Sequence, residues 1–211
     1  MTQQHTPDPF RIDSVAALRD VIGEKLPGSD TKVLTRLDSY AKAFIERSPF
    51  LVLCTADADG HQDASPKGDA PGFVLVENDS TIVIPDRPGN RLVMGHLNVL
   101  SQPGVGVLFI VPGTPETFRV NGRAELTRDP ELMDRLAARG KPALLGIRIH
   151  IDDCFFHCAK AFIRSNLWKP EKWGERHRVS FGEMFVSQSG NDQSMGEQID
   201  RAIEQDYKEN L

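Results

Sequence analysis

The spacing of short alternating apolar segments is the strongest constraint on the fold of this chain. Residues 116–126 are the clearest case, because Phe118, Val120 and Ala124 share one face of an extended segment whose other face is polar. Further strand candidates cover residues 50–55, 61–67, 73–76, 81–84, 105–111 and 143–151. The intervals are too short for the helical crossovers that parallel strands need. The sequence therefore predicts a mainly β protein with peripheral helices (α+β), built as a closed antiparallel barrel.

Helical periodicity lies outside and between these segments. We expect helices over residues 14–26 and 30–48, one from Pro88 to about residue 100, and one starting at Asp129-Pro130. Three regions follow: an N-terminal helical segment (1–48) packed on the barrel, the barrel itself (49–180), and a C-terminal tail (181–211). Residues 192–211 carry six acids and two bases around a thin apolar stripe, which predicts an acidic helix docked on the surface.

Composition excludes several classes of protein. A hydrophobic fraction of 39% is ordinary for a globular chain, and the formal net charge of -5 argues against broad nucleic-acid binding. No apolar run is long enough to span a bilayer, and residues 1–13 show no signal-peptide pattern. Three cysteines suit a reducing compartment. We therefore expect a cytoplasmic protein that binds neither nucleic acid nor membrane.

The turn at residues 85–91, with the sequence PDRPGNR, is a candidate anion site. It joins a predicted strand to a predicted helix start, where free backbone N–H groups and the helix dipole favour negative charge. Arg87 and Arg91 could each donate two hydrogen bonds to a phosphate. A solvated loop whose arginines pair with surface acids is the alternative.

Residues 63–69, with the sequence DASPKGD, form a second candidate. Ser65 and Lys67 have the same parity on a strand, so both could face one ligand. Pro66 is typical of an edge or an interruption in pairing, which leaves backbone groups free to bond a planar ring. The alternative is an irregular edge strand with a solvated lysine.

The third candidate is residues 154–168, interpreted as a helix. One face would carry His157, Lys160, Arg164 and Trp168, and the opposite, core face would carry Phe155, Cys158 and Phe162. The polar face suits either solvent or an anionic aromatic ligand. A metal site is not expected, because no second Cys/His pair completes the set around Cys154 and Cys158. The motifs GxGxxG, GxxxxGK[ST] and GxSxG are also absent.

Taken in order, these segments resemble the pyridoxamine 5′-phosphate oxidase-like superfamily of FMN-binding split β-barrels, and more closely a subgroup of probable FMN-dependent enzymes of unassigned substrate. The resemblance covers roughly residues 30–180. It rests on DASPKGD (63–69), IPDRPGNR (84–91), ETFRVNGRAEL (116–126) and HCAKAFIRSNLW (157–168).

The resemblance implies a homodimer with two FMN sites at the subunit interface. The positions that match the strand lining the isoalloxazine ring are Ser65, Pro66 and Lys67. Those that match the turn holding the ribityl phosphate are Pro85, Asp86, Asn90 and Arg91, with Arg87 as a weaker match. Those that match the segment reaching the flavin from the other subunit are Lys160, Arg164, Ser165 and Trp168.

The implied function is an FMN-dependent oxidoreductase that takes electrons from a nicotinamide, a deazaflavin or the substrate itself. The fold alone does not distinguish this from a flavin-binding module that stores, carries or senses FMN. A haem or tetrapyrrole binder using His150 or His157 is a third, less favoured reading. Because the chain lacks the C-terminal Arg-Leu-x-Pro strand of true pyridoxamine-phosphate oxidases, oxidation of vitamin B6 phosphates is not expected.

Overall fold

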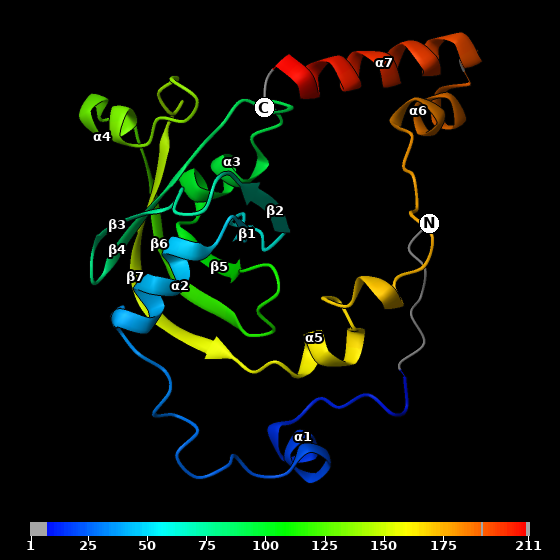
Figure 1. The fold of residues 1–211 in the computed structure, drawn as a ribbon. Coiled ribbons are helices and arrows are strands. Elements are labelled where there is room, and N and C mark those ends of the chain that lie inside the picture. Colours follow the sequence, from blue (N-terminus) through cyan, green and yellow to red (C-terminus); the bar gives the residue numbers. More distant parts are fainter. Residues whose placement is uncertain (1–7, 191, 210–211) are drawn as a thin grey trace.

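A seven-stranded antiparallel sheet forms the centre of the computed structural model, which describes residues 8–190 and 192–209 (Figure 1). The strands are β1 (Phe50–Ala56), β2 (Gln62–Gly68), β3 (Leu75–Asn78), β4 (Thr81–Pro85), β5 (Gly104–Ile110), β6 (Thr117–Thr127) and β7 (Gly146–His157). Their order across the sheet is β2-β1-β5-β6-β7-β4-β3.

The barrel is split, which confirms the split-barrel fold that the family resemblance implies and corrects the closed barrel that the strand pattern alone suggests. Within the described residues, the edge strands β2 and β3 pair with β1 and β4 but not with each other. Pro66 in β2 lacks a backbone N–H, which is a feature of edge strands. The seam between β2 and β3 therefore leaves backbone and side chains of β2 available to a ligand.

The alternation predicted for β6 is confirmed. Phe118, Val120 and Ala124 point into the core, where Phe118 packs on Phe109 at a ring-centroid distance of 6.2 Å. Full burial of one such side chain contributes roughly 1.5–3 kcal/mol. Ala41 and Ile45 from α2 (Ser39–Arg47) complete this core, so α2 is part of the barrel's packing.

The N-terminal helices are shorter than predicted. The segment after Ser29 is irregular because Leu34 exchanges two backbone hydrogen bonds with Cys154 of β7, at 2.9 and 2.8 Å. The helix α2 begins only after Asp38, whose carboxylate accepts a hydrogen bond from the Ala41 N–H. The first helix, α1 (Val15–Ile22), buries none of its residues.

The helix predicted to start near Pro88 begins later, as α3 (Met94–Ser101). The intervening turn is held by Asn90, whose side-chain oxygen accepts the Leu92 N–H at 3.0 Å, and Arg91 and Val93 adopt left-handed conformations. These conformations are incompatible with a helix that continues from Pro88. The helix predicted to start at Asp129-Pro130 is confirmed as α4 (Pro130–Arg135), capped by Asp129.

The prediction of a helix over residues 154–168 is wrong for its first part. Residues up to His157 belong to β7, and only α5 (Lys160–Ser165) is helical. Strand alternation therefore turns Cys154 and Phe156 inward, and the Phe156 ring packs in a tilted arrangement on Phe118, with a centroid distance of 4.8 Å. Phe155, predicted to lie in the core, instead lies under the Arg119 guanidinium at 4.2 Å.

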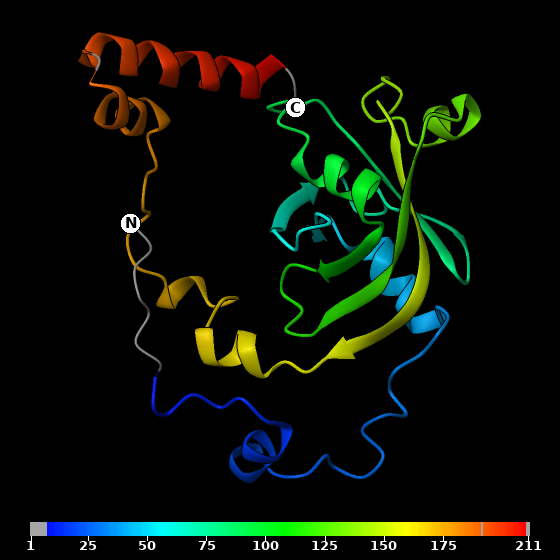
Figure 2. The same ribbon diagram turned by 180° about the vertical axis from the view of Figure 1, so that it is seen from behind.

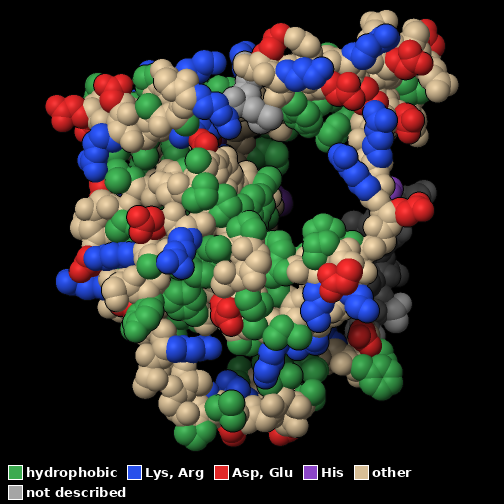
Figure 3. Space-filling model, in the orientation of Figure 1, with side chains coloured by type: hydrophobic (Ala, Val, Ile, Leu, Met, Phe, Trp, Pro, Cys, Tyr) green, Lys and Arg blue, Asp and Glu red, His purple; other side chains and the backbone are tan. Residues whose placement is uncertain are grey.

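Residues 158–190 and 192–209 form what we call the C-terminal arm. It contains α5, the 3-10 turn η1 (Pro170–Lys172), α6 (Phe181–Ser189) and α7 (Gln193–Glu209). The acidic tail is helical as predicted, but α7 packs on α6 rather than on the barrel (Figures 1 and 2). Figure 3 shows an opening between arm and barrel, bordered by hydrophobic side chains on the barrel side and by basic side chains on the arm side. Among the described residues, no helix is both long and apolar enough to cross a bilayer.

Candidate functional site

A cleft of about 390 Å³ lies between β2, the end of β4 and the start of α3. Small-molecule sites usually measure roughly 300–1,000 Å³. Its lining combines the inward positions of β2, the 86–96 segment and three apolar side chains from the sheet and a loop: Asp63, Ser65, Lys67, residues 86–96, Leu53, Leu144 and Ile147. The parity predicted for Ser65 and Lys67 is confirmed, since alternate residues of β2 are half-buried.

Asp86 is the electrostatic centre of the cleft. Its Oδ1 accepts a hydrogen bond from Lys67 Nζ at 3.1 Å and lies 3.3 Å from His96 Nε2. Burial would raise the pKa of Asp86, but its contact with His96 and the hydrogen bond and charge of Lys67 outweigh burial and lower that pKa. The carboxylate therefore stays ionised and fixes the position of the Lys67 ammonium.

His96 Nε2 is buried, and it lies within ion-pair distance of Asp86 but outside hydrogen-bond geometry. A hydrogen bond weakens steeply when its donor is misaligned, so this contact is mainly electrostatic. Buried polar atoms normally have a hydrogen-bond partner. Within the described part of the chain this nitrogen has none, so its polar contact is the one with the Asp86 carboxylate.

The start of α3 adds backbone donors. Val93, at the N-cap, makes no side-chain cap, so the N–H groups of Met94 and Gly95 have no acceptor within the helix. A Cβ on Gly95 would lie 3.4 Å from Asp63 Oδ2 and 3.9 Å from Ser65 Oγ, so the helix start sits directly against β2. Together with the adjacent Arg91, these donors favour an anion.

The structure brings together half of the predicted site residues. Those that line the cleft are Ser65, Lys67, Asp86, Arg87, Asn90 and Arg91. Pro66 lies on the exposed face of β2, and Pro85 is buried in β4 opposite Gly146, so neither side chain lines the cleft.

The remaining predicted residues lie on the arm, away from the cleft of the same chain: Lys160, Arg164, Ser165 and Trp168. Trp168 donates from Nε1 to the Thr114 carbonyl at 2.9 Å and stacks on Phe162 at 5.6 Å. That contact holds the start of the arm against the loop between β5 and β6. The two cations of α5, Lys160 and Arg164, and the Ser165 hydroxyl are exposed.

Sequence reasoning missed Asp63 and His96. Asp63 shares the parity of Ser65 and Lys67, so the pattern that identified them could also have identified it. His96 lay in a helix whose start was misplaced, and its position beside Asp86 depends on the left-handed turn that precedes Met94.

Comparison with known protein families gives a match over most of the barrel. Residues 37–158 match the family described as pyridoxamine 5′-phosphate oxidase. Comparison with curated proteins finds no match.

Similar solved structures include three bacterial proteins. HupZ from Group A Streptococcus is 16% identical with a TM-score of 0.46, covering 57% of this chain and 93% of its own. General Stress Protein 26 from Bacillus anthracis is 16% identical with a TM-score of 0.43, covering 55% and 88%. An FMN-binding protein from Syntrophomonas wolfei is 11% identical with a TM-score of 0.43, covering 56% and 88%. Because the family match runs from the entrance of α2 to the end of β7, over more than half of the sequence, the chain belongs to the pyridoxamine 5′-phosphate oxidase family.

Proposed function

We propose that this protein binds FMN in the cleft between β2, β4 and α3 and acts as an oxidoreductase on a substrate that is not assigned. The observation that carries the proposal is the convergence of Lys67, Arg91 and the uncapped N–H groups of α3 on one cleft. This cationic, amide-rich corner occurs in a chain with a net charge of -5. A nucleotide phosphate fits that donor set.

The cleft offers different chemistry at its two ends. Asn90, Arg91 and the start of α3 would hold the ribityl phosphate, and the inward face of β2 with Leu144 and Ile147 would hold the flat ring. The flavin supplies the redox chemistry when bound. Lys67, fixed by Asp86, places a positive charge beside the ring and would stabilise negative charge there.

We further propose a homodimer in which the arm of one chain covers the cleft of the other. Trp173, Phe181 and Phe185 on the arm expose 58%, 49% and 42% of their surface. Three apolar residues that line the cleft are exposed as well: Leu92, Met94 and Leu144. Apolar patches of this kind mark interaction surfaces. In the dimer, Lys160 and Arg164 would reach the partner's flavin. All three cysteines are free thiols, which suits a cytoplasmic protein.

Titration with FMN, followed by flavin fluorescence, tests the cleft. Arg91→Asn removes the guanidinium, and asparagine tolerates the left-handed backbone at φ 59. Loss of a charge-assisted hydrogen bond should weaken FMN binding by about 1.5–3 kcal/mol, or roughly ten- to a hundred-fold. The control, Lys141→Ala, removes an exposed cation outside the cleft and should bind like the wild type. Equal affinity of Arg91→Asn and wild type would reject the phosphate site.

Turnover and assembly need separate measurements. Anaerobic mixing of the FMN-loaded protein with NADH, NADPH or a reduced deazaflavin should bleach the oxidised flavin spectrum with at least one donor. An unchanged spectrum with all donors would instead support the non-catalytic flavin-binding protein. Sedimentation velocity should give a dimer, and a monomer holding one FMN per chain would contradict the shared site.

A further inference from the structure

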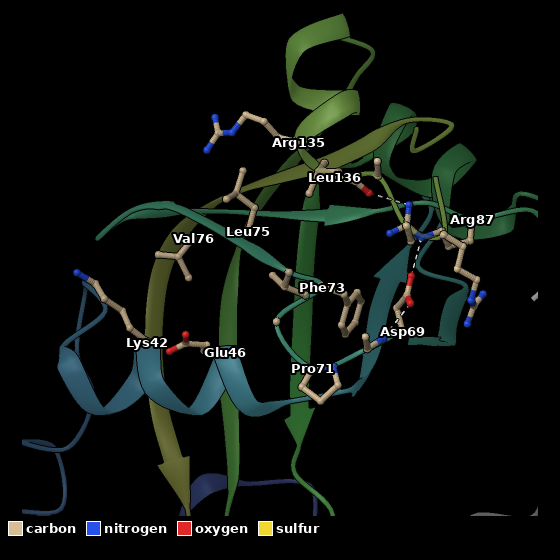
Figure 4. A pocket seen from close by; sticks show the side chains of 16 residues that line it. Lys42, Glu46, Asp69, Pro71, Phe73, Leu75, Val76, Arg87, Arg135 and Leu136 are labelled. Carbon is tan, nitrogen blue, oxygen red and sulfur yellow. Dashed lines mark hydrogen bonds and ion pairs between the residues drawn. The ribbon is translucent and has the colours of Figure 1, made fainter. Parts of the chain in front are cut away.

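A second hollow, larger than the cofactor cleft, lies between α2, the edge strand β3 and α4 (Figure 4). Its volume is about 720 Å³, within the usual range of small-molecule sites. We call it the α2–α4 groove. Figure 4 shows Lys42 and Glu46 on the α2 side, Arg135 on the opposite side, and Arg87 at one end.

The floor of the groove is apolar. It consists of side chains from the loop before β3, from β3 itself and from the end of α4: Phe73, Leu75, Val76 and Leu136. Phe73, Leu75 and Val76 are only partly buried, so their exposed surface is available to a ligand. Desolvation of this surface would favour a ligand with an apolar body.

Some of the cations on the rim of the groove form ion pairs, and others do not. Lys42 is paired with Asp79, and Arg87 is fixed by Asp69 at 2.8 Å and by the Leu136 carbonyl at 2.9 Å. Among the residues that the structure describes, Arg135 and Arg139 by contrast form no ion pair, and the Arg139 charge only helps to lower the pKa of Asp69 from a longer distance. Two unpaired guanidinium groups beside an apolar floor favour an anion.

Arg139 is held at the groove by an unusual backbone. It occupies the first central position of a two-residue turn between Ala138 and Lys141, with φ of 51° followed by 74° at Gly140. Such turns prefer Asn-Gly or Gly-Gly, because both central residues need positive φ. An arginine there is conformationally disfavoured. Outliers of this kind concentrate at functional positions.

We propose that the α2–α4 groove is a second ligand site, which binds an organic anion with an apolar body, namely a carboxylate or a phosphate monoester. Arg139, whose charge also reaches Asp69, binds the anionic head, and Phe73 and Leu75 contact the body. Arg87 lines both hollows and, held by Asp69, forms the wall between them. The site is therefore separate from the FMN cleft and does not depend on FMN binding.

The test is an amide NMR titration of the full-length protein with 2-naphthoate, 2-naphthyl phosphate and the uncharged 2-naphthalenemethanol. We expect the anions to shift amide signals in residues 72–76 and 136–140, with the alcohol binding at least ten-fold more weakly. A response to only one of the two anions identifies the head group.

Two variants make the test specific. Arg139→Gly removes the cation at a backbone position that suits glycine, so weaker binding cannot be attributed to misfolding. It should weaken naphthoate binding five-fold or more. Lys141→Ala, in the same turn but pointing to solvent, should bind like the wild type. Shifts located elsewhere, equal binding of the alcohol, or unchanged binding by Arg139→Gly would each overturn the proposal. Shifts produced only by an acidic extended peptide would assign the groove to pairing with β3 and overturn it too.

Discussion

The barrel and the C-terminal arm handle apolar side chains in opposite ways. Phe109 and Phe118 in the barrel are fully buried, whereas Phe181 and Phe185 in the arm expose 49% and 42% of their surface. In α6 and α7, the only residues that are buried are Gly182 and Gly196, which lie against each other. The barrel thus buries its aromatic side chains within its own core, while the arm leaves its aromatic side chains exposed, where another surface could cover them.

Two glycines show the same contrast in detail. A Cβ on Gly122 of β6 would overlap the carbonyl oxygen of His150 in β7, and a Cβ on Gly182 of α6 would overlap that of Gly196 in α7. The steric requirement is the same, but the first contact lies at a bulge in the central sheet and the second joins two peripheral helices. The same glycine-to-alanine substitution at each site therefore shows how much each region contributes to the free energy of unfolding.

Gly122→Ala should have the largest effect. The new methyl group forces β6 and β7 apart in the middle of the core, and overpacking of this kind costs about 3 kcal/mol. Urea unfolding followed by circular dichroism measures the loss. Gly106→Ala in β5 is the control, because its methyl would meet only ordinary contacts at 3.4 Å and 3.9 Å. A loss below about 1 kcal/mol for Gly122→Ala would mean that the sheet yields at the bulge.

Asp86→Asn should have an intermediate effect, and only at pH values where the carboxylate is ionised. The substitution removes the charge that pairs with Lys67, at a cost of about 1.5 kcal/mol. Because the folded-state pKa of Asp86 is lowered from 3.8, its stabilisation is complete well above that value and is lost as the pH falls through the lower, folded-state pKa.

Urea unfolding of the FMN-free protein between pH 7 and pH 3 checks this dependence. The difference between wild type and Asp86→Asn should be greatest near neutral pH and should shrink below about pH 4. Asp59→Asn, in the exposed turn between β1 and β2, is the control. A difference that stays constant with pH would show that Asp86 acts through packing rather than through its charge.

The barrel could be predicted from sequence because alternation and short intervals between strands are local signals. Phe118 and Val120 are both buried, as the alternation of a strand predicts. The turn between β3 and β4 was also predicted from its own residues. The end of β7 was harder to predict, because Phe155 and Phe156 are adjacent and both aromatic. Only the pairing of β6 with β7 decides which of them enters the core.

The candidate site was predicted in its residue types but not in its geometry. Ser65 and Lys67 follow strand parity, which any β2 of this sequence would give. The position of His96 beside Asp86 depends on left-handed backbone at Arg91 and Val93, which are residues that rarely adopt it. The arm residues Lys160 and Arg164 could be matched to a motif, but a single chain does not bring them to its own cleft.

Gly182→Ala should have the smallest effect on global stability. The methyl group pushes α6 away from α7 and breaks the hydrogen bond from the Gly182 N–H to Asp200 Oδ1, at 2.9 Å. Neither helix contributes to the barrel core. The free energy of unfolding of the barrel, measured with urea, should therefore change by less than about 0.5 kcal/mol. Hydrogen exchange at the amides of α6 and α7 should accelerate, because the contact that protects them is lost.

Gly174→Ala is the matched control in the arm, because a Cβ there would meet no atom within 4 Å. If the arm covers a partner chain, as proposed, Gly182→Ala should also weaken the dimer in sedimentation velocity while Gly174→Ala should not. A large fall in barrel stability on Gly182→Ala would contradict the separation of the two regions, because it would require the arm to carry part of the core's folding energy. Faster exchange confined to the arm would instead show that its order depends on contacts outside the barrel.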